Sequence, residues 1–401
     1  MKIKKLKLLL FLSIFLLAAA VPFFSGCAGR TGVTRLQFLR TEDGTAYHVR
    51  VRFGTYANGV VELPSEHRGR PVTGIIAPGF RGGTHFIAVT IPASVTYIAS
   101  NAFRNTPALT VIMQGLEPPE QHDDSFNNAA NTSTGVKAII VPDAALQAYR
   151  TAWSTRASHI HPASNVINDY FLVDDGVLIS YFGWQEEVIV PTQVTSISGR
   201  AFRNNQGIRR ITIPQSVSSI DPDGFRGTSE LSYIAVAAGN ESFSSRNGIL
   251  YNAAGTRIEY IPSRLGGAVV IPDGFVSMRV TGQNVNYNFS DAARANYFAG
   301  TLITSITIPG SFDIIPADFL RDTAQLTSVT LNEGITRIAP RSFANAARLN
   351  AITIPSTVTF ISADAFAGAR NLTITVPFTE DGTPSGWVEG WNAGRPVVFA
   401  P

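Results

Sequence analysis

The sequence predicts a repeat solenoid, rich in β-strand with short turns and 3-10 segments, and capped at both ends. A spaced apolar series recurs after 23 residues, since position 349 repeats position 326. One unit carries about six apolar side chains, each worth roughly 1.5–3 kcal/mol when buried. Ordering the unit costs about 1–2 kcal/mol per residue, so one unit alone is unstable. Only a stacked array with covered ends is therefore expected to fold.

The clearest units lie between Leu326 and Val376. Their apolar positions are Leu326, Val329, Leu331, Ile335, Ile338 and Phe343, repeated by Leu349, Ile352, Ile354, Val358, Ile361 and Phe366. Upstream copies begin at Phe86, Val188, Ile208 and Ile303. Pro191 and Pro214 are again 23 residues apart, so the units share one register.

Several units share one sequence pattern, seen in TIPASVTYIASNAF, IVPTQVTSISGRAF, ITIPQSVSSIDPDGF and ITIPSTVTFISADAF. They resemble the BspA-like class of bacterial leucine-rich repeats, whose unit reads LxxIxIPxxVxxIxxxAFxxC. The resemblance covers most of residues 59–377. The Cys of that pattern is replaced by Thr106, Asn205, Thr228 or Ala369. Because the slot takes a small buried side chain, we expect the fold to be unchanged.

Residues 1–27 have the features of a lipoprotein signal peptide. Four lysines precede the apolar stretch 8–21, which is too short to span a bilayer. Phe24 to Cys27 then resembles a lipobox, and Cys27 is the only Cys in the chain. Lipidation of Cys27 would anchor an exported protein at the outer membrane or cell surface, since several acyl chains anchor stably. The alternative is an ordinary secretory signal with a chance Cys.

The net charge gives no indication of a nucleic-acid binding surface. The chain has 32 Lys and Arg against 29 Asp and Glu, a net charge of +3. Residues 1–27 hold four Lys and no acid, which leaves 28 against 29, or −1. A nucleic-acid footprint needs a clustered positive face. Beyond residue 27, Lys137 is the only Lys.

The remaining sequence divides into four regions. We expect an N-terminal cap over 28–58, where 47–53 alternates as a half-buried strand does. A first repeat tract follows over 59–163, closed by strand, short helix and strand in 138–162. A second tract over 164–377 carries two hairpin signals, Asp175-Gly176 and Asn247-Gly248, and a protruding segment at 285–289. Residues 378–401, with Trp387 and Trp391, form a C-terminal cap.

The sequence offers no catalytic or cofactor motif. It lacks HExxH, GxSxG, CxxC and a Gly-rich phosphate loop. His159 and His161 would share one strand face as a possible metal pair, and residues 122–124 offer further ligands. We interpret both groups as solvated polar residues, because structural sites need four ligands. The prediction is a protein that is not an enzyme and holds no metal or cofactor.

The predicted partner-binding surface is periodic. The residue between the two core positions of each strand faces outward, which gives Thr90, Thr212, Thr307, Thr330 and Thr353. Stacking would align them as a threonine ladder, although high β propensity alone could also explain Thr there. Arg209, Arg210 and Tyr233 are the neighbouring side chains that we favour most for partner contact.

Three functions follow as hypotheses. The first is a surface or periplasmic lipoprotein whose solenoid binds protein or glycan partners. The family resemblance implies adhesion to host matrix, to other bacteria or to epithelial cells, with no nucleic-acid partner and with membrane contact only through the lipid. The second is an envelope scaffold that associates with itself or another envelope protein. The third is an enzyme or glycan-processing accessory, which the missing motifs disfavour.

Overall fold

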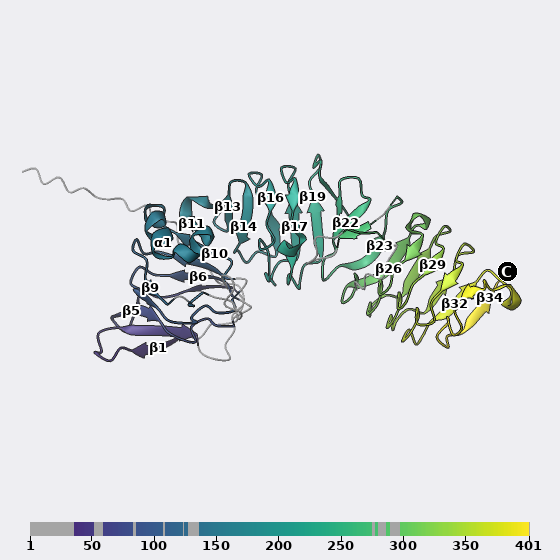
Figure 1. Ribbon diagram of the computed structural model, residues 1–401, viewed down its shortest axis with the longest axis horizontal. Coiled ribbons are helices and arrows are strands. Elements are labelled where there is room, and N and C mark those ends of the chain that lie inside the picture. The colour runs from purple at the N-terminus through teal and green to yellow at the C-terminus, as the bar shows by residue number, and fades with distance from the viewer. Residues whose placement is uncertain are drawn as a thin grey trace, which may run out of the picture.

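The computed structural model describes residues 36–51, 59–82, 86–106, 109–122, 124–126, 136–274, 277–279, 286–288 and 297–400. They form a curved rod of stacked strand-rich turns, which runs from the purple N-terminal end to the yellow C-terminal end (Figure 1). Cys27 lies outside the described residues, as do parts of the predicted protruding segment 285–289. Among the described residues, no helix is long and apolar enough to cross a membrane. The predicted solenoid is confirmed.

Two sheets build the N-terminal tract. The first contains β1 (Leu36–Arg40), β2 (Tyr47–Val51), β5 (Arg70–Ile75), β7 (Tyr97–Ile98) and β9 (Glu120–Gln121), with β4 (Glu66–His67) beside β5. The second has the order β11 (Ile160–Pro162), β10 (Ala138–Val141), β8 (Thr110–Met113), β6 (Phe86–Ile91) and β3 (Gly59–Glu62). The helix α1 (Leu146–Ala152) lies between β10 and β11, as the sequence predicts.

Five sheets follow along the rest of the rod. The first contains β12 (Val166–Ile167), β13 (Phe171–Asp174), β14 (Val177–Tyr181), β16 (Ser196–Ile197) and β18 (Ser219–Ile220), and the second contains β15 (Glu187–Ile189), β17 (Arg210–Ile213) and β19 (Tyr233–Val236). The third contains β20 (Phe243–Arg246), β21 (Ile249–Asn252), β22 (Arg257–Tyr260), β24 (Ser277–Arg279) and β25 (Asn286–Asn288). The fourth contains β23 (Gly266–Val270), β26 (Leu302–Ile308), β28 (Ser328–Leu331), β30 (Ala351–Thr353), β32 (Thr373–Val376) and β34 (Val397–Phe399), and the fifth contains β27 (Ile314–Ile315), β29 (Arg337–Ile338), β31 (Phe360–Ile361) and β33 (Gly386–Trp387). In the described part of the chain, 3-10 segments cover Asp143–Ala145, Ser154–His159, Ala163–Asn165, Pro222–Phe225, Gly310–Phe312 and Glu380–Gly382.

The regular turns repeat at an offset of 23 residues. In the parallel pair β26 and β28, Ile306 lies opposite Val329 and Thr307 opposite Thr330. Side-chain hydrogen bonds keep the same offset, as where Thr327 Oγ1 donates to Thr304 O at 2.9 Å. Nearest-neighbour contacts of this kind are what stabilise a solenoid.

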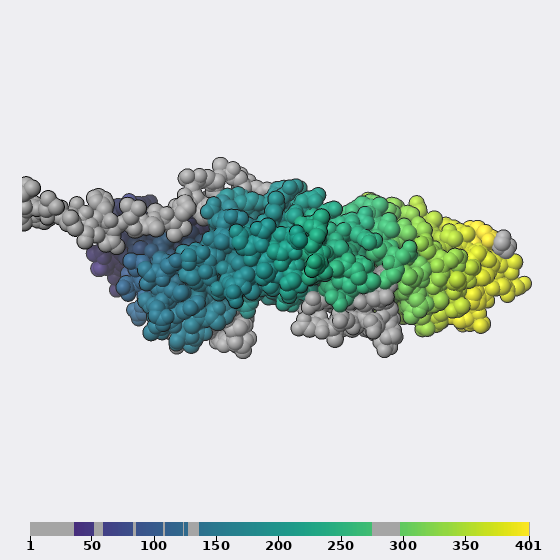
Figure 2. All heavy atoms as spheres, turned by 90° about the horizontal axis from the view of Figure 1, so that it is seen from above, coloured from purple at the N-terminus to yellow at the C-terminus, as the bar shows by residue number. Residues whose placement is uncertain are grey.

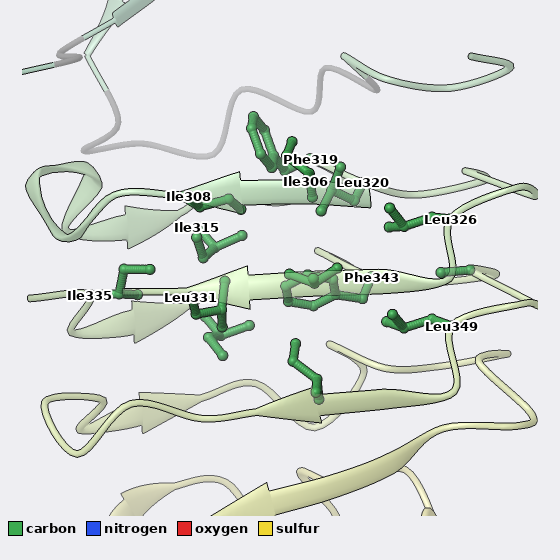
Figure 3. Packing of buried hydrophobic residues seen from close by; sticks show 14 of the residues in the cluster. Ile306, Ile308, Ile315, Phe319, Leu320, Leu326, Leu331, Ile335, Phe343 and Leu349 are labelled. Carbon is green, nitrogen blue, oxygen red and sulfur yellow. The ribbon is translucent and has the colours of Figure 1, made fainter. Parts of the chain in front are cut away.

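The core is a stack of apolar side chains between the two sheets of each turn. Figure 3 shows Ile306, Phe319, Leu326, Phe343 and Leu349 lying in successive layers. All of these side chains are buried. Phenylalanine rings also stack from turn to turn, with 5.3 Å between the ring centroids of Phe343 and Phe366. The apolar positions read from the sequence are therefore the core.

The slot that holds Cys in the repeat pattern is buried here. Thr106, Thr228 and Thr323 fill it, and each is inaccessible to solvent. Each hydroxyl donates to a carbonyl three residues earlier, at 2.6–2.7 Å. Since a buried hydroxyl is tolerated only when it is hydrogen-bonded, this bond explains how Thr replaces a thiol.

The direction of stacking changes where the two tracts meet, between β11 and β13 (Figure 1). The packed body continues across this junction (Figure 2). Residues 163–165 form a 3-10 turn there. A separate apolar cluster joins the outer face of β6 and β10 to the hairpin β13–β14, through Ile87, Ala88, Ala138, Ile140, Leu172 and Phe182. Thr110 Oγ1 and Ser180 Oγ share a buried hydrogen bond of 2.8 Å across it.

This junction corrects one prediction. Thr90 was expected on the exposed strand face, but its side chain is only 7 % exposed. Every residue of β6 is buried. The reason is that the second tract packs on the outer face of this sheet, which the repeat pattern of a single unit does not reveal.

Candidate interaction surface

The outward strand face of the C-terminal part is uncharged and rich in hydroxyl groups. Strands β23, β26, β28, β30, β32 and β34 contain no charged residue. Thr307 lies opposite Thr330, and Thr353 lies opposite Thr375. Val270 and Val398 extend this row at its two ends. We call the outward face of these six strands the threonine face.

A second row runs beside the first. It contains Ser305, Ser328, Ala351 and Thr373, each in register with the next. Because alternate residues of a strand point to opposite faces, the intervening Ile306, Val329, Ile352 and Ile374 are buried. The hydroxyls therefore lie on a rigid support, with Thr330 and Thr353 exposed and Thr307 half-buried.

Thr212 does not belong to this face. It lies in the separate sheet of β15, β17 and β19, between Ile189 and Ala235. The strands β20 to β22 belong to another sheet and intervene along the chain. The predicted single ladder is thus wrong in its extent, because the hairpin turn of the repeat interrupts the row of strands. Thr307, Thr330 and Thr353 do share one face.

Arg210 and Tyr233 are brought together as neighbours in register on β17 and β19. The Arg210 guanidinium lies over the Tyr233 ring, 4.1 Å from its centroid. Such cation–π pairs contribute about 0.5–1 kcal/mol at exposed sites. Arg209 precedes the strand and pairs with Glu186, with 3.4 Å between Nε and Oε2. Both partners of this ion pair are about half exposed, so the pair is weak and either side chain can form an ion pair with a binding partner instead.

Sequence reasoning missed the support beneath Tyr233. Gly248, in the turn of the hairpin β20–β21, has φ of +83°, and a Cβ there would lie 2.8 Å from the Tyr233 ring. Its carbonyl accepts from the N–H of Ile234 at 3.0 Å. The Asn-Gly signal indicated a turn, but only the fold places that turn against Tyr233.

The predicted metal candidates do not assemble a site among the described residues. His159 lies in the 3-10 segment before β11, and His161 lies within β11. His161 Nδ1 is 3.0 Å from Asp174 Oδ2. Over the described ranges, no three His, Cys, Asp or Glu side chains gather closely enough to hold a metal ion.

The repeat itself decides the family. The family model of the BspA type leucine rich repeat region matches six copies, over residues 71–144, 182–261 and 286–376. These ranges together make up more than half of the chain. The chain belongs to this family. The resemblance noted in the sequence is confirmed, and proteins built from BspA-type repeats are generally binding proteins rather than enzymes.

Solved structures of similar proteins are bacterial leucine-rich repeat proteins. A leucine rich cell surface protein of Faecalibacterium prausnitzii A2-165 is 20 % identical, with 91 % of this chain and 93 % of that chain covered and a TM-score of 0.37. The pneumococcal vaccine antigen PcpA is 15 % identical, with coverage of 93 % and 98 % and a TM-score of 0.37. A leucine-rich repeat protein of Bacteroides ovatus ATCC 8483 is 16 % identical, with 89 % of each chain covered and a TM-score of 0.25. No curated protein matches this BspA-type chain by sequence.

Proposed function

We propose that this BspA-type protein is a non-catalytic lipoprotein, anchored through Cys27, whose threonine face binds a protein or glycan partner outside the cell. The observation that carries the proposal is the uncharged row of hydroxyls from Thr307 to Thr375. Each hydroxyl both donates and accepts, so the row complements a partner that is itself rich in hydroxyl or amide groups. A preformed rigid face also loses little conformational entropy on binding.

The test compares three threonines of the threonine face with one exposed threonine on the opposite sheet. The triple variant Thr307→Glu, Thr330→Glu and Thr353→Glu places three charges on this face. Thr359→Glu is the control, since Thr359 is exposed beside β31 of the opposite sheet. Binding is measured to a glycan array and to immobilised matrix proteins. We expect at least a 10-fold loss for the triple variant and no change for the control. Equal binding by all three proteins would refute this use of the face.

Arg209, Arg210 and Tyr233 form a second contact region in this proposal. Their Ala variants remove a half-exposed ion pair and a half-buried cation–π pair. If alanine at all three positions leaves partner binding unchanged, these residues take no part in it.

The scaffold function has one supporting observation. β34 ends its sheet, pairs with β32 and presents Val398 and Phe399 to solvent. An open apolar edge strand is a template for pairing with another chain. Sedimentation over a range of concentrations, with Val398→Lys as the edge variant, separates the two functions. Oligomers that Val398→Lys abolishes, without binding to any host ligand, would favour the scaffold.

Localisation is tested on intact cells beside a Cys27→Ala variant. Protease should remove the wild-type protein from the surface, and the variant should be released to the medium or periplasm. Protection of the wild-type protein until the cells are lysed would argue against adhesion and favour the scaffold.

A further inference from the structure

A cavity of about 450 Å³ lies at the junction of the two tracts, apart from the threonine face. Lys137 and His159 line it from the first tract, and Arg200, Arg203 and Asp221 line it from the second. Its volume falls within the range of about 300–1,000 Å³ that is typical of small-ligand sites.

Several basic side chains line this junction cavity. Lys137 is 2 % exposed, and its Nζ donates to Tyr181 O at 3.4 Å and to Ala201 O at 3.2 Å. Burial lowers the pKa of Lys137 to about 7, so its amine is only partly charged at neutral pH. In the protonated form it has three N–H donors, which leaves one for an anionic group in the cavity. Arg200 Nη1 lies 3.3 Å from His159 Nε2, which makes the lining more basic.

The arginines of the cavity form no close ion pair. Among the described residues, neither Arg200 nor Arg203 has a carboxylate oxygen within the 4.0 Å of an ion pair. Burial and the nearby Arg226 lower the pKa of the Arg203 guanidinium, and the charge of Asp223 only partly opposes them. Burial and the neighbouring Arg200 lower the pKa of His159 in the same way. An anion in the cavity would relieve this repulsion.

Two carboxylates also line the cavity. Asp221 and Asp223 both contribute to its wall, and Asp221 Oδ1 accepts from the N–H of Asp223 at 3.0 Å. Free carboxylates repel a simple inorganic anion and accept hydrogen bonds from hydroxyl groups. The lining therefore suits a molecule that carries both one anionic group and several hydroxyls.

We propose that the junction cavity binds a small hydroxylated carboxylic acid, such as a uronate sugar. Its carboxylate lies against Lys137, Arg200 and Arg203, and its hydroxyls donate to Asp221 and Asp223. The ligand bridges the two tracts, because its cationic contacts come from both. This site is independent of partner binding by the threonine face.

The experiment is calorimetric titration of the full-length protein with glucuronate, glucose and inorganic phosphate. Glucose lacks the carboxylate, so its affinity shows how much that group contributes to binding. Inorganic phosphate is an anion without sugar hydroxyls, so its affinity shows what the hydroxyls contribute. We expect saturable binding of one glucuronate, at least 10-fold tighter than either of the other probes. Arg203→Gln should weaken it about 10- to 100-fold, the usual range for a hydrogen bond to a charged group.

Arg348→Gln is the control. Arg348 is exposed, donates to Gln325 in the C-terminal turns and does not line the cavity. Its substitution should change glucuronate affinity less than 2-fold. If Arg203→Gln does not fold, Arg200→Gln is judged by the same criterion.

Four results would overturn the proposal. They are no saturable binding of glucuronate, equal binding of glucose, tighter binding of phosphate, and an equal effect of Arg348→Gln. The triple Glu variant of the threonine face should bind glucuronate as the wild type does, so the failure of one site is distinguishable from the failure of the other.

Discussion

Arg341 donates two hydrogen bonds, from Nε and Nη2, to the two carboxylate oxygens of Asp318, each at 2.8 Å. The two residues occupy the same repeat position in adjacent turns, 23 residues apart. Arg341 Nη1 also lies 3.5 Å from Asp364 Oδ2, one turn further on. An Asp–Arg–Asp column therefore links three adjacent turns, and its contact with the buried Asp318 is bidentate.

The first prediction concerns this column. The Asp318 side chain is only 5 % exposed, so Arg341→Ala leaves a nearly buried carboxylate without its main partner. We expect a loss of about 1–3 kcal/mol in the unfolding free energy of the C-terminal turns. Urea unfolding followed by Trp fluorescence measures it. Arg348→Ala, which removes an exposed bond to Gln325 at the same offset, should cost less than about 0.5 kcal/mol.

Acid titration gives an independent check of the column. Hydrogen bonds from Arg341 lower the pKa of Asp318 below its ordinary value of 3.8. This stabilisation is present above the unfolded-state pKa and is lost as the pH falls through the lower folded-state value. Stability should therefore fall more in the wild type than in Arg341→Ala below about pH 4. If the unfolding free energy of the two proteins falls equally with decreasing pH, Arg341 does not lower the pKa of Asp318.

The second prediction concerns the hydroxyl slot. Thr323 is fully buried and its Oγ1 donates to Leu320 O at 2.6 Å. Thr323→Cys should be tolerated, because Cys is small and occupies this slot in the repeat pattern. Thr323→Val keeps the volume but loses the hydrogen bond, for about 0.5–1.5 kcal/mol. Thermal unfolding of both variants checks the order; a less stable Cys variant would show that packing, not the bond, decides the slot.

The third prediction concerns Lys137 and pH. Burial, with a smaller effect of Arg203, lowers the pKa of Lys137 from 10.5 to about 7. Between these values the unfolded chain binds a proton that the folded chain does not, so stability rises with pH. The slope is about 1.4 kcal/mol per pH unit for one proton. Unfolding in urea at pH 7.5 and 9.5 measures the gain, which Lys137→Met should abolish.

Other titrating groups do not mask this slope. Burial also lowers the pKa values of His159 and His161, whose effects have the same sign but lie below pH 6.5. Burial raises the pKa values of Tyr149 and Tyr181, which would oppose the slope only above pH 10. An equal gain in the wild type and in Lys137→Met would show that Lys137 is not the source.

The fourth prediction concerns the junction. Leu172 is fully buried in the apolar cluster between the tracts. Leu172→Ala should cost about 2–5 kcal/mol and loosen the packing on β6. Hydrogen exchange at the amides near Thr90 and Thr110 should then speed up, while exchange in β28 and β30 stays unchanged. Unaltered exchange at Thr90 would mean that the second tract does not protect it.

The sequence determined the repeating part of this protein. The 23-residue period placed Ile352, Phe343 and Leu349 in the core, and the buried Thr slot followed from the same alignment. Asp318, Arg341 and Asp364 are also spaced by 23 residues, so their contact could have been predicted from the sequence. In a solenoid each turn touches its neighbours, and a fixed offset in sequence therefore fixes the contacts in space.

Only the tertiary structure decided what happens where the period breaks. The bond between Thr110 and Ser180 spans 70 residues, and Lys137 reaches Ala201 across 64. These contacts depend on how one tract packs on the face of the other, which buries Thr90 and forms the cavity. No period relates such residues, because their separation reflects the packing of two surfaces and not the length of a turn.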